Sequence, residues 1–132
     1  MLLFALASTL AACADSKAPK TADSNTIPTK YKDEVIETLK ELFVKTDTVS
    51  VTGAFITDPT LRPVDNEQHY TICVRYMAHS TVPGVTGNAE RIGYFYNGHL
   101  NQLVEADGGQ CRGAPYKPFP ELDRVCIGTG CK

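Results

Sequence analysis

The strongest constraint on the fold of this chain is the pair Asn97-Gly98, which separates two runs of alternating apolar and polar residues at 91–96 and 99–105. Both residues of the pair tolerate the positive φ that a two-residue type I′ turn requires. The sequence therefore predicts an antiparallel hairpin. Its regular register predicts two apolar cross-strand pairs, Phe95 with Leu100 and Ile92 with Leu103.

Two further stretches, 48–56 and 69–77, alternate with the period of half-buried strands. The second is the better strand, because it places four large apolar residues on one face and Cys73 on the other: Tyr70, Ile72, Val74 and Tyr76. The stretch 58–63 holds two prolines, which cannot donate to a strand ladder, and predicts a loop. The stretch 79–88 holds one proline and two glycines and predicts a second loop.

A helix is expected over 29–45, where apolar residues recur at spacings of three and four. Pro28 suits its N-terminal boundary. These apolar residues form one stripe of an amphipathic helix: Tyr31, Val35, Ile36, Leu39, Leu42 and Phe43. A helix lying on a membrane is the alternative, but the glutamates of the polar face favour packing against the core.

The tail 108–132 contains three prolines and is expected to be irregular and extended rather than helical. In a polyproline geometry one side would carry Tyr116, Phe119 and Leu122, which could close the sheet or line a groove for a partner. Together the segments predict an α+β fold. We expect one N-terminal amphipathic helix packed on a roughly four-stranded, mainly antiparallel sheet, followed by an irregular, disulfide-stapled C-terminal tail.

Five cysteines, an odd number, are present in the 132 residues. The run Leu10-Ala11-Ala12-Cys13 closes an uncharged apolar segment and resembles the lipobox of bacterial lipoproteins, which are cleaved by signal peptidase II. The resemblance implies a signal peptide over 1–12 and acyl chains, palmitate among them, on Cys13.

If Cys13 carries lipid, an even set remains, and in an oxidising compartment such a set predicts disulfides: Cys73, Cys111, Cys126 and Cys131. Four cysteines allow three connectivities. We favour Cys73 with Cys111 and Cys126 with Cys131.

The domain plan that follows is a signal peptide, a lipidated cysteine with a flexible tether over 13–27, and one small domain over 28–132. Ala14 rather than Asp follows the lipidated cysteine, which by the enterobacterial sorting rule favours the outer membrane, facing the periplasm, over the inner membrane. The apolar segment of about a dozen residues is shorter than the roughly 20 that a membrane-spanning helix needs.

The composition and motifs exclude several functions. A net charge of −2 gives no broad basic field, so nucleic acid is not an expected partner. The sequence lacks a hydrolase elbow, a zinc-protease helix and a phosphate-binding glycine loop, so no catalytic residue and no cofactor are expected. Paired CxxC spacing is missing and the three histidines are scattered, so no metal site is expected: His69, His79 and His99.

A binding surface is the remaining candidate. In the predicted hairpin register one face carries two tyrosines beside polar groups, as binding sites often do: Tyr94, Tyr96, His99 and Asn101. The alternative is that this face lies under the helix. The sequence thus predicts a non-catalytic lipoprotein that binds an unknown protein or other component of the envelope. The alternative is an inhibitor or immunity-type protein that inserts the 79–88 loop or the tail into a target enzyme.

Overall fold

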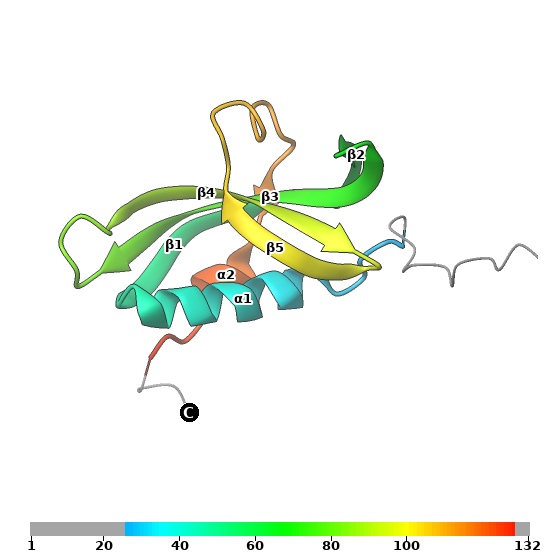
Figure 1. Cartoon of the computed structure of the whole chain (residues 1–132). Helices are drawn as coiled ribbons and strands as arrows, with labels where there is room; N and C mark the ends of the chain where they lie inside the picture. Colours follow the sequence, from blue (N-terminus) through cyan, green and yellow to red (C-terminus); the bar gives the residue numbers. More distant parts are fainter. Residues whose placement is uncertain (1–25, 129–132) are drawn as a thin grey trace, which may run out of the picture.

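The computed structural model describes residues 26–128 (Figure 1). The predicted signal peptide 1–12, Cys13, most of the tether and Cys131 lie outside this range. The described elements are, in chain order, α1 (Tyr31–Lys45), β1 (Thr48–Ile56), β2 (Thr60–Val64), β3 (Glu67–Ser80), β4 (Gly87–Tyr96), β5 (His99–Glu105), β6 (Lys117–Pro118) and α2 (Pro120–Asp123).

The fold is α+β, as predicted, with one antiparallel sheet. Its strands follow the order β5-β4-β3-β1-β6, and β2 pairs with β3 beside this path. The predicted count of four strands was therefore too low, since the described residues form six. Figure 1 shows α1 and α2 on one face of the sheet, here called the inner face, and the segment 106–116 rising from the other, the outer face.

The helix α1 begins two residues later than predicted and ends at Lys45 as expected. Only three residues of its predicted apolar stripe are buried, Val35, Leu39 and Phe43, which follow one another at intervals of four. The other three pack against the core but stay partly exposed, because the sheet contacts the helix along one narrow line: Tyr31, Ile36 and Leu42.

The β4–β5 hairpin has the predicted turn. Asn97 and Gly98 have φ values of 54° and 78°, both positive as a type I′ turn requires. Phe95 pairs with Leu100 as predicted, but the expected pairing of Ile92 with Leu103 was wrong. A β-bulge inserts one extra residue into β5, so that each pair beyond it moves by one place: Ile92 pairs with Val104 and Gly93 with Leu103.

The two predicted loops are both shorter than expected. Residues 60–64 form strand β2 despite Pro63, because β2 pairs with β3 alone and an edge strand tolerates a missing N–H. The strands β3 and β4 extend the second hairpin to Ser80 and Gly87. The predicted 79–88 loop is therefore reduced to a turn over 81–86.

A bulge in β1 attaches the tail to the sheet. Gly53 has a φ of 62°, and the ladder to β3 shifts between Thr52 and Phe55. The next residue, Ala54, points both backbone groups at the tail: its N–H donates to Asp123 Oδ1 at 2.9 Å, and its carbonyl accepts from the N–H of Phe119 at 2.8 Å. The bulge thus provides the binding site for α2.

The tail is more ordered than predicted within the described residues. It forms the two-residue strand β6 at the edge of β1 and the short helix α2, with Pro120 at its first turn. Phe119 and Leu122 are fully buried in the main core, where they close the sheet edge. Tyr116 does not share their side, because it packs on the outer face beside the disulfide.

The disulfide Cys73–Cys111 forms as predicted and ties the central strand β3 to the segment 106–116. Both cysteines are buried with Ile92 in a small second core on the outer face. Cys126 is also disulfide-bonded. The predicted partner of Cys126 lies outside the described residues.

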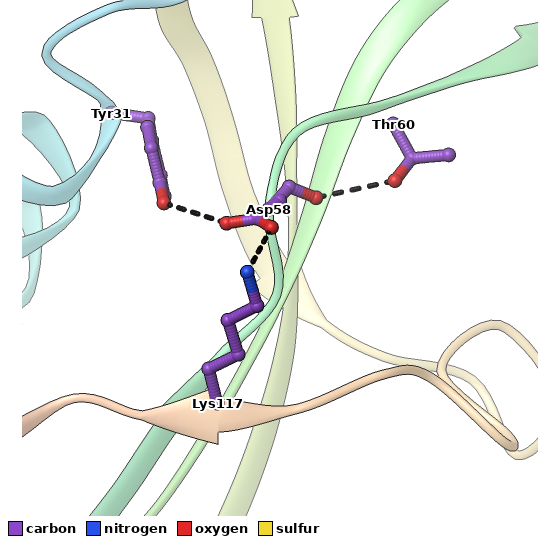
Figure 2. A network of polar contacts seen from close by, with 4 residues as sticks. All are labelled: Tyr31, Asp58, Thr60 and Lys117. Atoms are coloured by element: carbon purple, nitrogen blue, oxygen red, sulfur yellow. Dashed lines mark hydrogen bonds and ion pairs between the residues drawn. The ribbon is translucent and has the colours of Figure 1, made fainter.

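A polar network joins α1, the β1–β2 connection and β6 (Figure 2). Asp58 accepts hydrogen bonds from Lys117 Nζ at 2.5 Å and from the Tyr31 hydroxyl at 3.3 Å. The hydrogen bond from Lys117 contributes most to lowering the pKa of Asp58 below its usual 3.8, because it stabilises the carboxylate.

This network predicts a small, pH-dependent effect of Asp58→Asn. A depressed carboxyl pKa contributes stability that is present above the unfolded pKa and is lost as the pH falls through the folded pKa. We therefore expect urea unfolding at pH 7 to show a loss of under ~1 kcal/mol, as is usual for an exposed ion pair. The difference from wild type should shrink below about pH 4. An equal loss at pH 7 and pH 2.5 would show that the charge of Asp58 is not the cause.

Candidate functional site

The predicted tyrosine surface lies on the outer face, away from α1. Tyr94 packs against the second core beside Cys73 and Ile92. The next outward residue, Tyr96, is 40% exposed, and its ring stacks on His69 of β3 with centroids 5.3 Å apart. The alternative placement under the helix is therefore wrong for Tyr94 and Tyr96.

A groove of about 540 Å³ follows this surface, and we call it the outer-face groove. Its walls come from β4, β5, the β2–β3 turn, His69 of β3 and the start of the segment 106–116. They contain three of the four predicted binding residues, Tyr94, Tyr96 and Asn101. The other polar and charged residues of the lining are His69, Gln102, Gln110 and three carboxylates, Asp65, Glu105 and Asp107.

The fourth predicted residue, His99, does not line the groove. Its Nδ1 lies 2.9 Å from Glu34 Oε1 of α1, and the other carboxylate oxygen of Glu34 accepts from the N–H of Leu100 at 3.2 Å. His99 thus belongs to the contact between the hairpin and the helix. The sequence register could not reveal this, because the contact depends on where α1 crosses the sheet.

Gln110 fixes one wall of the groove. Its Nε2 donates to the hydroxyl of Tyr94 at 3.0 Å, and its Oε1 accepts from the N–H of Asp107 at 2.8 Å. Its carbonyl accepts from Arg62 Nη1 at 2.6 Å. These bonds hold Tyr94 in one orientation, so the groove has a preformed polar wall of the kind that fixes the orientation of a ligand.

The charge of the groove restricts what it can bind. Three carboxylates and no lysine or arginine belong to its lining. Phosphate and other anions would be repelled, whereas neutral hydroxyl or amide groups and cations would meet acceptors and aromatic faces. The groove therefore suits a neutral or positively charged partner.

A second cavity of about 500 Å³ opens on the inner face, between the C-terminal half of α1, strands β3 and β4, and the 81–86 turn. It contains Arg91 and Tyr76, which no sequence pattern marked as site residues. Arg91 Nε donates to the Tyr76 hydroxyl at 3.1 Å. The available signal was an arginine at an inward position of β4, where an apolar residue is usual.

The three histidines lie apart from one another, and each contacts a different residue. His69 lies 3.3 Å from Glu67, His79 lies 3.1 Å from the Thr52 hydroxyl, and His99 contacts α1 as above. Within residues 26–128, no group of three or more histidine, cysteine or acidic residues is arranged to hold a metal ion.

Arg75 also lies on the outer face, where it contacts two aromatic rings. Its guanidinium lies between two rings, 4.8 Å from the centroid of Phe55 and 4.4 Å from that of Tyr116. Tyr116 in turn donates a hydrogen bond to Glu90 at 2.7 Å. These contacts bind the tail to the sheet beyond the outer-face groove.

Comparison of the chain with protein-family models, with curated proteins and with solved structures gives no match. In the described part of the chain, neither helix has the length and apolar character needed to cross a bilayer. The functional conclusions therefore depend on the geometry and chemistry of the two sites.

Proposed function

We propose that this chain is a non-catalytic, lipid-anchored periplasmic protein that binds another envelope component through the outer-face groove. The supporting observation is the groove itself. It brings Tyr94, Tyr96 and Asn101 together with His69 and Gln110 in a preformed, open concavity. Exposed aromatic rings beside amides and carboxylates are typical of binding surfaces.

The anchor is supported by the lipobox resemblance at Cys13, which lies outside the described residues. Multiple acyl chains hold a protein firmly to a membrane, whereas a single chain binds marginally. The outer membrane, facing the periplasm, is the proposed location. The Cys73–Cys111 disulfide agrees with an oxidising compartment.

The partner should present neutral or cationic groups, because the lining of the groove is acidic. A polyhydroxylated glycan or a basic, aromatic-containing segment of an envelope protein has the right chemistry. Both would place flat or apolar groups on Tyr96 and hydrogen-bond donors on the carboxylates of the groove.

The second candidate is an inhibitor or immunity-type protein. It is favoured by one observation, the exposure of two apolar residues, Val82 and Val85, at the 81–86 turn. A protruding apolar turn between two long strands could enter the cleft of a target enzyme. The tail is less suited to this role, because Phe119 and Leu122 are buried in the core.

One crosslinking experiment separates these functions. A photo-crosslinking amino acid is placed at Tyr96, at Val85 or at Val44 in the full chain, in the bacterium that produces it. Val44 is the matched control, since it is 61% exposed and lies on α1. We expect adducts with one envelope component at Tyr96 and none of these at Val44.

Adducts with an enzyme at Val85, together with none at Tyr96, would support the inhibitor instead. The same adducts at all three positions would contradict both functions. Mass spectrometry of the purified protein tests the anchor separately, because the mature chain should begin at Cys13 with the added mass of its acyl chains. A chain without acyl groups would reject the anchor and leave the test of the groove intact.

A further inference from the structure

The inner-face cavity lies on the opposite face of the sheet from the outer-face groove and shares only Glu105, at the end of β5, with its lining. Its lining is mixed. Apolar side chains come from α1, β3, β4 and the 81–86 turn: Leu42, Phe43, Ala78, Val85 and Ala89. Polar and charged residues form much of the rest: Thr46, Thr48, Tyr76, Asn88, Glu90, Arg91 and Glu105. Its volume of about 500 Å³ lies within the ~300–1,000 Å³ that small-molecule sites usually have. A ligand with a polar head and a small apolar body would match this mixed lining.

Two hydrogen-bond donors remain available in this cavity. The Tyr76 oxygen accepts from Arg91 Nε, which leaves the hydroxyl hydrogen of Tyr76 free to donate. Among residues 26–128 nothing accepts that hydrogen, and no carboxylate forms an ion pair with the Arg91 guanidinium. The terminal nitrogens of Arg91 and the hydroxyl hydrogen of Tyr76 can therefore donate to a ligand from neighbouring positions.

The tyrosine is held in its neutral, donating form. Burial raises the pKa of Tyr76 above its usual 10.0, and the nearby Glu105 carboxylate adds to this rise, whereas Arg91 opposes it. The side chain is 4% exposed and its ring packs edge-on against Phe43, with centroids 5.5 Å apart. The hydroxyl thus has a fixed position and a proton to donate at neutral pH.

We propose that the inner-face cavity binds a small monocarboxylate with an apolar body, whose carboxylate is held by Arg91 and Tyr76. A guanidinium offers parallel N–H groups that match the two oxygens of a carboxylate. The apolar side chains of the lining would contact the rest of the molecule. This site goes beyond the proposed function, since it lies on the opposite face of the sheet.

Glu105 explains why the ligand should carry one charge rather than two. It is the cross-strand neighbour of Arg91 in the β4–β5 ladder and lines the same cavity. Glu90 lines the cavity as well, but its carboxylate accepts the hydrogen bond from Tyr116 on the outer face. The Glu105 carboxylate opposes an incoming anion, and a single guanidinium can balance only part of that repulsion. A phosphate dianion is therefore disfavoured.

The test measures octanoate binding to the full chain by calorimetry or by NMR titration. We expect Arg91→Gln to weaken octanoate binding about 10-fold or more, because it removes both the positive charge and the paired N–H groups of the guanidinium. Tyr76→Phe should weaken it about 10-fold to 100-fold by removing one hydrogen bond to a charged group. Octan-1-ol, which has the same apolar chain and no charge, should bind the wild type at least about 10-fold more weakly than octanoate.

Two further variants make the test independent of folding defects. Arg75→Gln removes an arginine of the neighbouring strand from the outer face and should leave octanoate binding unchanged. Glu105→Gln removes the repulsion and should tighten octanoate binding about 2-fold to 5-fold. A variant that merely unfolds cannot produce this gain.

The proposal is overturned by any of three results. The first is that octanoate does not bind the wild type saturably. The second is that octanoate and octan-1-ol bind with equal affinity. The third is that Glu105→Gln weakens octanoate binding while Arg91→Gln leaves it unchanged. Each of these results leaves the crosslinking at the outer-face groove unaffected, so the two proposals can fail separately.

Discussion

Phe119→Ala is expected to lower the free energy of unfolding by about 3–5 kcal/mol, the usual cost of truncating a fully buried phenylalanine. Phe119 has no exposed surface, and its N–H donates to the carbonyl of Ala54 at the β1 bulge. The truncation would leave a cavity between α2 and the sheet. Urea unfolding followed by circular dichroism measures the loss.

Phe55→Ala is the matched control for this prediction. Phe55 lies on β1 beside the same bulge, but its ring is only partly buried and faces Arg75 on the outer face. Its truncation should cost less than half as much as that of Phe119. Equal losses in the two variants, or a loss under ~1 kcal/mol for Phe119→Ala, would mean that the tail contributes little to the core.

Removing the disulfide by the double substitution Cys73→Ala and Cys111→Ala should cost about 2–5 kcal/mol. The bridge closes a loop across a sequence separation of 38 residues, so it removes much of the freedom of the unfolded chain. Alanine is preferred to serine because both positions are buried, and an unpaired hydroxyl would add a cost of its own. The measurement is again urea unfolding, without reductant.

Wild-type protein reduced with dithiothreitol is the control for the double variant. Wild type in dithiothreitol should lose at least as much stability as the double variant, because Cys126 is disulfide-bonded as well. A double variant within about 1 kcal/mol of wild type would show that noncovalent contacts hold the segment 106–116 without the bridge. Two such contacts are the bond from Arg62 to Gln110 and that from Tyr116 to Glu90.

The parts of the fold that depend on local chemistry could be predicted from the sequence. The Asn97-Gly98 turn, the strands 48–56 and 99–105 and the end of the helix at Lys45 all agree with the structure. The bulge in β5 could not be predicted. Alternation in β5 is compatible with a regular register as well as with one extra residue, and only the packing of both faces selects between them.

The missed strand β2 has a different cause. Pro63 argues against a central strand, but whether a strand is central or at an edge depends on the topology of the whole sheet. The short helix α2 was missed because it too depends on the rest of the fold. Its prolines argue against a long helix, yet Pro120 at the start of a short one is favourable, and the β1 bulge supplies partners for it.

The two sites differ in how far the sequence could reveal them. Tyr94, Tyr96 and Asn101 were selected because hairpin pairing alone places them near one another. Arg91 and Tyr76 meet across β3 and β4, two strands whose pairing register cannot be read from either strand by itself. The walls of the outer-face groove were also hidden, since Gln110 reaches it only through the segment that the disulfide holds.

The position of Thr26 has a consequence for how the domain would stand on a membrane. A Cβ added to Gly98 would lie 3.0 Å from the Thr26 side chain, so the polypeptide enters the domain beside the β4–β5 turn (Figure 1). A domain tethered through its N-terminus is therefore held at that end. The ten-residue strand β4 then places the 81–86 turn about 30 Å away from the point of attachment, at the end of the domain that such a membrane would leave free.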